Sequence, residues 1–367
     1  MNDQEEPRNL RRVLGFWALV AYGVGDILGA GIYALTGEIA AIAGRASWIA
    51  FAVALGIAGL TSLSYAELSG RFPKSGGEAK YCQEGFGSKR IAFFVGWLVL
   101  CSGVLSMATV SHAFAGYILA SSEIHSEVIR RVLAAGFLVV IGFEDMANVA
   151  EEVKNPRRTL PIAILTVVGI TGVIYLLVIW VATHVVTPDV LANSDAPLLE
   201  VVRHAAPSVP PILFTTIALF AVGNTGLLNS VTTSRLLYGM AGQQLLPGWV
   251  GKIHPKTRTP NRAIVIILFA AAALALTGTL GFLGGATSAL ILLVFLAVNL
   301  ALVGVRLRSG GHRAEGGFSV PLVFPIVAAT CCLALVGFVS FESMLRAGAL
   351  AGIGVVFVLL RLRRGGR

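Results

Sequence analysis

The stretch Gly23-Val-Gly25-Asp26-Ile27-Leu28-Gly29-Ala30-Gly31-Ile32-Tyr33 lies in the middle of the first apolar segment of the chain. Four glycines and an aspartate weaken an α-helix at this point, because glycine costs helix stability and aspartate favours helix ends. Unwound backbone at membrane depth is tolerated only where protein or a water-filled cavity covers it. The stretch therefore predicts a helix that is broken inside a membrane protein.

Composition supports the membrane assignment. Of 367 residues, 56% are hydrophobic and 13% are charged, whereas a soluble domain carries about 25% charged residues. Apolar segments long enough to cross a bilayer recur along the chain. We predict an all-α polytopic membrane protein with about ten transmembrane helices, at residues 13–36, 47–69, 91–120, 132–150, 160–184, 210–237, 262–281, 284–305, 320–341 and 344–361.

The basic residues predict an orientation, because cytoplasmic loops of membrane proteins are enriched in lysine and arginine. With the N-terminus in the cytoplasm, 23 of the 28 basic residues fall in inside segments and five fall outside, namely Arg45, Arg130, Arg131, Arg203 and Arg346. We therefore expect an integral protein of the plasma (cell inner) membrane with both termini cytoplasmic. The short basic clusters form no continuous basic face, which argues against a nucleic-acid partner.

A second interruption is predicted in the fourth segment. Only about twelve apolar residues, from Val132, precede Gly142, Glu144 and Asp145, which is too short to span the bilayer. Paired broken helices are typical of transporter sites, because freed N–H groups attract an anion and freed carbonyls accept an ammonium group. An amino acid carries both groups on one carbon. The alternative is that these glycines serve close helix packing.

Several motifs together resemble the amino acid–polyamine–organocation (APC) permeases. The first helix matches at Gly25–Gly37, and Tyr65–Pro73 resembles the exit of the second helix. Gly142-Phe-Glu144 with Ala150–Pro156 resembles the sixth helix and its loop. Asn224-Thr225, Ser234–Met240, Leu246-Pro247 and Thr259-Pro260 resemble the eighth helix and the following loop.

The resemblance implies an inverted-repeat bundle with broken first and sixth helices that moves an amino acid, coupled to protons or sodium or by exchange. We expect one permease domain over residues 1–367. Residues 13–120 hold the first repeat, 132–305 the second, and 320–361 two extra helices. The resemblance places the substrate carboxylate at the amides of Ala30 and Gly31, beside Gly29. It places the amine at the carbonyls of Ile27, Leu138 and Ile141, with Gly142 at the second break.

The chain departs from this family between Ala120 and Val132, where two helices of the usual twelve are expected and only Ser121–Arg131 is available. We therefore expect family helices four and five to be missing. In proton-coupled members of the family, helix five supplies a lysine at the cation position. Two alternatives to an active transporter stay open: a transport-impaired remnant, and a substrate-sensing protein on a permease scaffold. Without helices four and five, one side of the first helix loses its protein cover, so we expect loose packing beside the first helix.

Polar residues inside the predicted spans are candidates for function. Glu144 and Asp26 are the coupling candidates, although Asp26 could equally cap the broken helix, as we expect of Asp145. We expect Glu67 to pair with Arg71, four residues on.

Three further polar residues are weaker candidates. His112 is interpreted as a hydrogen-bonded packing residue rather than a proton relay. Ser106 and Asn224 are weak candidates for lining a substrate pocket, with hydrogen bonds between helices as the simpler interpretation.

Other function classes lack support in the sequence. The zinc-protease motif His-Glu-x-x-His and the serine-hydrolase motif Gly-x-Ser-x-Gly are both absent, so we expect no enzyme. The four cysteines show no metal-binding spacing, and we expect no catalytic residue, metal or cofactor beyond a coupling ion. The predicted partners are an amino-acid substrate and the lipid bilayer.

Overall fold

The computed structural model describes residues 12–73, 77–120, 126–145, 152–153, 155–254, 259–308 and 318–364. The first half contains α1 (Phe16–Ile27), α2 (Ala30–Ala43), the 3₁₀ turn η1 (Gly44–Ala46), α3 (Ser47–Arg71), α4 (Gly77–Phe86), α5 (Lys89–Leu119) and α6 (Glu127–Asp145). The second half contains α7 (Pro156–Val185), α8 (Pro188–Ala192), α9 (Pro197–Ala205), α10 (Pro211–Gly242), α11 (Asn261–Thr277), α12 (Leu280–Arg308), α13 (Val323–Val336) and α14 (Phe341–Arg364).

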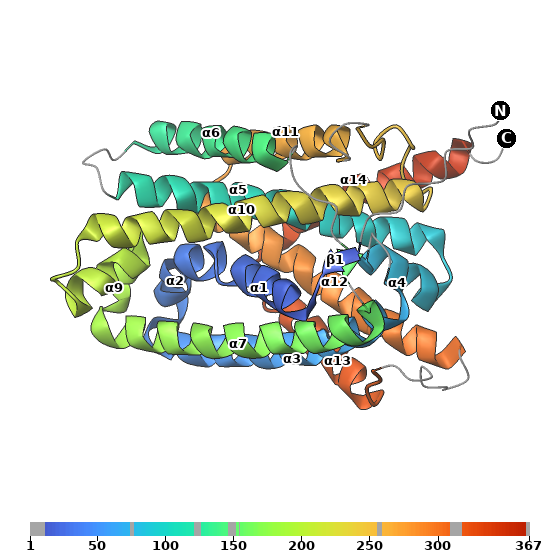
Figure 1. The fold of residues 1–367 in the computed structure, drawn as a ribbon, viewed down its shortest axis with the longest axis horizontal. Helices are drawn as coiled ribbons and strands as arrows, with labels where there is room; N and C mark the ends of the chain where they lie inside the picture. Colours follow the sequence, from blue (N-terminus) through green and yellow to red (C-terminus); the bar gives the residue numbers. More distant parts are fainter. Residues whose placement is uncertain are drawn as a thin grey trace.

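The helices form a layered bundle whose long axes run roughly parallel (Figure 1). Helices α6 and α11 pack together on one side, over α5 and α10, and α7 packs along α3 on the opposite side. The broken pair α1–α2 lies between these layers, with α10 on one side and α7 on the other. The all-α membrane fold predicted from the sequence is therefore present.

Each of the ten predicted segments coincides with a helix, and α1 with α2 form the first. Within the described ranges, six helical stretches are long and apolar enough to cross a membrane, or seven if the bent pair α13–α14 is one span. The angle between α13 and α14 is 112°, and α11 is a shorter apolar helix. The number of crossings and the division into repeats stay predictions.

Two short strands are an addition that the sequence did not predict. Strand β1 (Arg12–Leu14) pairs in parallel with β2 (Glu152–Val153). The pairing places Arg12–Leu14, just before α1, beside Glu152–Val153, just before α7.

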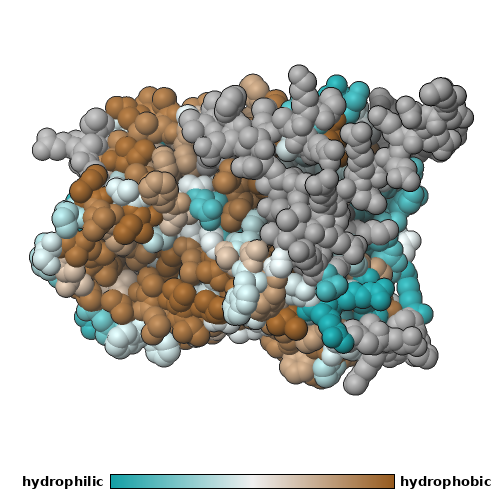
Figure 2. Space-filling model, viewed as in Figure 1, coloured by the Kyte–Doolittle hydropathy of each residue, from teal (hydrophilic) through white to brown (hydrophobic). Residues whose placement is uncertain are grey.

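Apolar side chains make up much of the described surface. Figure 2 shows hydrophobic residues over much of the visible face and hydrophilic residues gathered at the end where α4 lies. Large apolar side chains are exposed on the outer helices, among them Phe220 on α10 at 76% and Phe269 on α11 at 76%. Such exposure is expected of side chains that face lipid instead of water.

Candidate functional site

The first helix is broken at the predicted position. Helix α1 ends at Ile27, and the amide of Leu28 closes its last turn by donating to the carbonyl of Val24 at 2.9 Å. Gly29 has a non-helical backbone (φ −87°, ψ −121°), and α2 begins at Ala30. The interruption predicted within Gly25–Gly31 is therefore confirmed, and it creates one helix C-terminus and one helix N-terminus inside the bundle.

Two side chains of α10 bind the carbonyls that the break frees. The Asn224 amide donates to the carbonyl of Gly25 at 3.1 Å, and the Thr225 hydroxyl donates to the carbonyl of Asp26 at 3.1 Å. The last carbonyls of a helix have no partner within the helix and must find one elsewhere. Asn224, which the sequence offered as a weak candidate, therefore lies at the break itself.

The third freed carbonyl is bound by α7. The Tyr175 hydroxyl donates a hydrogen bond to the carbonyl of Ile27. The same hydroxyl lies against the first turn of α2, since a Cβ atom built on Gly31 would be 2.9 Å from it. Tyr175 therefore bridges the two half-helices at the position where the sequence predicts the substrate head group.

Gly29 is required by a close approach of α10. A Cβ atom built on Gly29 would lie 1.5 Å from the Thr225 hydroxyl and 2.8 Å from the carbonyl of Ala221. Backbone cannot move out of the way as a flexible side chain can, so no larger residue fits here. The glycine thus allows Thr225 to reach the carbonyl of Asp26.

The N-terminus of α2 lies at the same break. Its N-cap Gly29 has no side chain that could accept from the first amides, and the Tyr175 hydroxyl lies next to the amide of Ile32, the third residue of the helix. The first N–H groups of such a helix are unsatisfied within the helix and carry partial positive charge. The predicted carboxylate role of the Ala30 and Gly31 amides is compatible with this arrangement and stays a prediction.

Asp26 lies on α1 at the last turn before the break. Its side chain is half-buried. Among the described residues, no lysine, arginine or histidine forms an ion pair with this carboxyl group. Its backbone carbonyl accepts a hydrogen bond from Thr225, but this contact does not involve the carboxyl group. The choice between a coupling role and a capping role for the Asp26 side chain therefore stays open.

The second predicted break has a different outcome. Helix α6 is continuous from Glu127 through Gly142 to Asp145, so the described backbone contains no interruption at Gly142. A single glycine costs a helix only about 1 kcal/mol, which explains why the helix passes through it. The helix ends at Asp145, and residues 146–151 lie outside the described part. The side chains of 139–145 also lie outside it, so the roles of Ile141, Gly142, Glu144 and Asp145 stay predictions.

The described part of α6 packs on α5, α10 and α11. Leu138 is 1% exposed and belongs to the main hydrophobic core. The rings of Phe137 and Phe114 stack with their centroids 3.9 Å apart. Phe137 also contributes to an apolar cluster with Tyr33 and Val222, which is how α6 approaches the broken helix pair.

The remaining polar candidates serve packing. Ser106 accepts a hydrogen bond from Asn229 at 3.0 Å, which joins α5 to α10, as the simpler interpretation predicted. The His112 Nε2 atom bonds the carbonyl of Ala275 at 2.9 Å. Glu67 pairs with Arg71 at 2.7 Å, as the spacing predicted.

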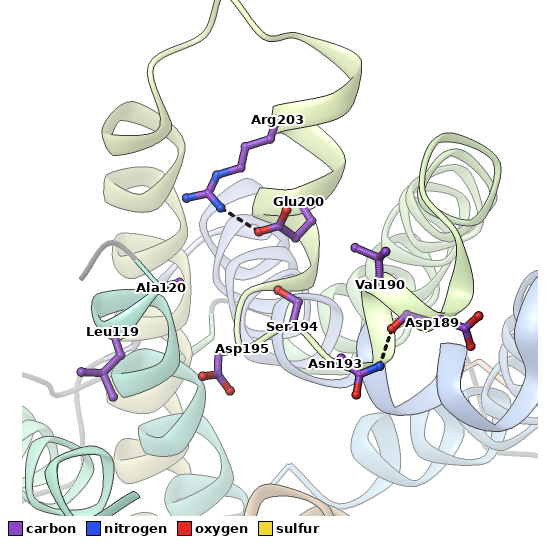
Figure 3. A pocket seen from close by; sticks show the side chains of 9 residues that line it. All are labelled: Leu119, Ala120, Asp189, Val190, Asn193, Ser194, Asp195, Glu200 and Arg203. Carbon is purple, nitrogen blue, oxygen red and sulfur yellow. Dashed lines mark hydrogen bonds and ion pairs between the residues drawn. The ribbon is translucent and has the colours of Figure 1, made fainter. Parts of the chain in front are cut away.

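A cavity opens at the end of the bundle that carries the loop between α7 and α10. It measures about 560 Å³ and lies between the end of α5 and the segment from α8 to α9. Figure 3 shows Asp195 and Ser194 side by side in its wall, with the Glu200–Arg203 ion pair above them. The cavity does not include the break.

Comparison with known proteins now decides the family. A family model described as amino acid permease matches residues 128–360, and a second family model of the same description matches residues 14–141. The first match alone covers more than half of the chain. The chain belongs to the amino acid permease family. It is a membrane transporter and not an enzyme.

Relatives of the permease carry transporter names. An uncharacterized transporter of Mycobacterium tuberculosis is 26% identical, over 97% of this chain and 92% of the relative. The methylthioribose transporter of Bacillus subtilis is 24% identical, over 91% of this chain and 89% of the relative. The branched-chain amino acid permease of Bacillus subtilis is 24% identical, over 97% of this chain and 94% of the relative.

The alignments also bear on the length of the permease. The alignment with the Mycobacterium tuberculosis transporter spans 420 positions, which is 53 more than the 367 residues of this chain. At least that many positions of the relative have no counterpart here. This number is close to the length of two membrane helices of about 20 residues each with their loops.

Sequence reasoning missed two residues that the permease uses. Tyr175 reaches the break from 148 positions along the chain, and Arg306 reaches Glu67 from 239 positions away. Each lies in or at the end of an apolar helix with no local motif around it. Only Arg306, directly after the predicted span 284–305, carried a signal, because a charge at the end of an apolar helix needs a partner if it is buried.

Proposed function

We propose that this permease moves an amino acid by secondary active transport and binds its head group at the break between α1 and α2. The observation that carries the proposal is the set of contacts at this break. Side chains from α7 and α10 hold the carbonyls of Gly25, Asp26 and Ile27, while the N-cap of α2 is a glycine and supplies no side-chain cap. The break therefore places the last carbonyls of α1 beside the first amides of α2.

The head group of an amino acid matches this arrangement. Its carboxylate would accept hydrogen bonds from the amides of Ala30 and Gly31, where the helix N-terminus favours negative charge. Its ammonium group would donate to the carbonyl of Ile27. The predicted acceptors on α6, the carbonyls of Leu138 and Ile141, lie within a continuous helix, so they would join only if α6 unwinds there. Because a carbonyl has two lone pairs, the ammonium group would share the Ile27 oxygen with Tyr175 or replace its hydroxyl.

Coupling to protons or sodium is the finer part of the proposal. Asp26 at the break and Glu144 on α6 are the carboxyl groups offered for this role, because a carboxyl at membrane depth is costly unless it serves binding or proton transfer. We place the permease in the cell inner membrane with both termini in the cytoplasm. The support is the distribution of lysine and arginine, with only five of 28 in outside segments.

The shorter first repeat suggests that coupling is weak in this permease. We assign the missing positions to family helices four and five, between α5 and α6. Helix α1 has one fully buried described residue, Val20, and Trp17 beside it is 75% exposed. A broken helix with so little cover admits water or lipid, and either weakens ion-driven accumulation. A permease that exchanges one substrate molecule for another is therefore the favoured form of the proposal.

Uptake into vesicles tests the proposal. The full chain is purified and reconstituted, and uptake of radiolabelled leucine, arginine, glutamate and methylthioribose is followed with and without a proton or sodium gradient. We expect saturable uptake of at least one amino acid, with less accumulation under a gradient than in a twelve-helix relative. Binding without movement would make the protein a sensor and overturn the proposal. Strong gradient-driven accumulation would overturn only its coupling part.

A further inference from the structure

The outer face of α10 carries one amide among large apolar side chains. Leu213, Ile217 and Phe220 are 54%, 52% and 76% exposed, and Asn224 is exposed as well. Their spacing of four, three and four residues places all four on one side of the helix. Figure 2 shows the first half of α10 as a largely hydrophobic surface with a small hydrophilic area in it. We call these four residues the α10 stripe.

Asn224 lies deep in the membrane. At 1.5 Å per residue it is about 20 Å from the start of α10 and about 27 Å from its end. A helix of this length, centred on the bilayer, extends beyond the hydrocarbon core of about 30 Å on both sides. The exposed amide of Asn224 is then close to the middle of the core, where water does not solvate it.

The Asn224 amide has hydrogen-bonding groups that the chain does not use. Its Nδ2 atom donates to the Gly25 carbonyl at 3.1 Å, and a carbonyl only accepts, so Nδ2 and not Oδ1 faces α1. Among the described residues, the second N–H of Nδ2 and the Oδ1 atom have no further hydrogen-bond partner. Lipid chains offer neither donor nor acceptor, so an exposed amide at this depth favours a protein partner.

The other sides of α10 are covered within the chain. Helices α5, α6 and α11 pack on it, as do α1 and α2. Ala218 and Val222 on the covered side are both 0% exposed. The second asparagine of the helix, Asn229, is turned toward α5 and donates to Ser106 at 3.0 Å. The α10 stripe is therefore the side of α10 that remains for a partner.

The chemistry of the stripe suits a second copy of the same chain. In a dimer with a two-fold axis, residues near the axis meet their own copies, so a charge there would be repelled by an identical charge. Residues 211–234 contain no aspartate, glutamate, lysine, arginine or histidine. Two asparagine amides are also self-complementary, because each can donate one N–H to the Oδ1 of the other and keep its second N–H for Gly25.

We propose that two copies of this permease associate through their α10 stripes, with Asn224 paired to Asn224 of the partner subunit. The two-fold axis runs along the membrane normal, so both α10 helices cross the bilayer in the same direction and the two amides lie at equal depth. Leu213, Ile217 and Phe220 pack against their copies on the outer side of the amide pair. A single asparagine in an apolar seam fixes register and oligomeric state in helix pairs. The proposal goes beyond the proposed function and does not depend on transport.

Cross-linking in vesicles tests the interface directly. Phe220→Cys is made in the full chain together with Cys331→Ser, because Cys82, Cys101 and Cys332 are buried. The protein is reconstituted at low density and oxidised with copper phenanthroline, and the products are separated without reductant. Phe269→Cys on α11 is the matched control, since Phe269 is also 76% exposed but lies outside the stripe. Light scattering in detergent gives the mass of the unmodified protein.

We expect a disulfide-linked dimer of Phe220→Cys and none of Phe269→Cys, with a protein mass twice that of the chain. Asn224→Leu should raise the dissociation constant of the dimer on the order of tenfold, the effect of losing two hydrogen bonds between helices. Asn224→Gln keeps an amide and should retain most of the association. Thr225→Val removes the other side-chain contact to the carbonyls of α1 and should leave the dissociation constant unchanged, which separates damage at the break from loss of the amide pair.

Three results would overturn the dimer: a monomeric mass at every protein concentration, equal cross-linking of Phe220→Cys and Phe269→Cys, or an unchanged dissociation constant in Asn224→Leu. Lipid alone, or a helix of another polypeptide, on this face would give the first result. Uptake is a separate measurement. A dimer without uptake would leave the interface standing and contradict the proposed function, and uptake by a monomer would do the reverse.

Discussion

Arg306 on α12 and Glu67 on α3 form a bidentate ion pair with two N···O distances of 2.8 Å, and the two side chains are 5% and 0% exposed. The Val320 amide donates to the same carboxylate at 2.8 Å, and Arg306 donates to the Val320 carbonyl at 3.1 Å. The ion pair therefore binds the segment before α13 to both α3 and α12. Arg71 is the second basic side chain that forms an ion pair with Glu67.

Replacing Glu67 with glutamine should destabilise the protein strongly, because Arg306 would keep its charge in a buried place without a full partner. Breaking a buried pair in this way costs roughly 3–5 kcal/mol. Thermal denaturation in detergent measures the effect. Glu342→Gln, which breaks the exposed pair with Arg346, should cost less than about 1 kcal/mol. Equal losses in the two variants would mean that the Glu67 pair is not the stabilising contact described here.

Tyr175→Phe should keep the fold and tighten binding of the transported amino acid. The hydroxyl competes with the substrate's ammonium group for the Ile27 carbonyl, and a hydrogen bond of this kind is worth about 1 kcal/mol net. We expect an apparent KM lowered by roughly fivefold in the vesicle assay. Tyr22→Phe is the control, since that hydroxyl binds Thr232 instead, at 3.2 Å. A raised KM in Tyr175→Phe would instead make the hydroxyl a ligand for the substrate.

Gly29→Ala should abolish uptake and reduce the yield of folded protein. Its methyl group would overlap the Thr225 hydroxyl and the Ala221 carbonyl. Gly136→Ala on α6 is the matched control, because a Cβ atom there meets nothing within 4 Å. That substitution should be neutral or stabilising by up to about 1 kcal/mol, the helix-propensity difference. Size-exclusion profiles and uptake together check both variants, and full activity of Gly29→Ala would refute the close approach.

Glu78→Gln should alter how stability depends on pH. Burial raises the pKa of the Glu78 carboxyl group above its usual value, against an opposing hydrogen bond from Tyr65. The folded state then holds its proton up to a higher pH than the unfolded state does. The free energy of unfolding contributed by Glu78 therefore decreases as the pH rises from its pKa in the unfolded state to its pKa in the folded state. The apparent Tm of the wild type minus that of Glu78→Gln should become smaller as the pH is raised from acidic to neutral. Parallel Tm curves, with Glu84→Gln as the same-helix control, would contradict this.

Glu144→Gln tests the coupling candidate on α6. If Glu144 takes up the proton that accompanies the substrate, the variant should insert and bind normally but lose the pH dependence of uptake. Uptake measured from pH 5 to pH 8 in vesicles, with Asp26→Asn in parallel, separates the two carboxyl groups. An active variant with the wild-type pH profile would place Glu144 among the structural residues.

Local sequence signals predicted the helices and the first break well. The glycines and Asp26 act on their own stretch of backbone, so the interruption can be inferred from residues 23–33 alone. The start of α6 was placed too late, at Val132 instead of Glu127. The cause is the pairing of Glu127 with Arg131, which extends a helix among polar residues.

The contacts that hold the break could not be predicted in the same way. Tyr175 is one tyrosine in a long apolar helix, and which carbonyl it meets depends on how α7 packs on α1. Arg306 seemed to belong to a cytoplasmic loop, whereas helix α12 extends to Arg308 and buries it. Such pairings follow from the packing of whole helices, on which a single sequence carries little information.

The partners of the broken helix also set an order of events during synthesis. Asn224 and Thr225 are each 199 residues further along the chain than the carbonyls they cap. At about 5–20 residues per second, translation needs roughly 10–40 s to supply them. During that interval the freed carbonyls of α1 must be hydrated or held by the insertion machinery, because lipid offers no hydrogen-bond donor. The first helix is thus made early and completed late, and a ribosome that stalls before α10 would leave it without the side chains that cap it.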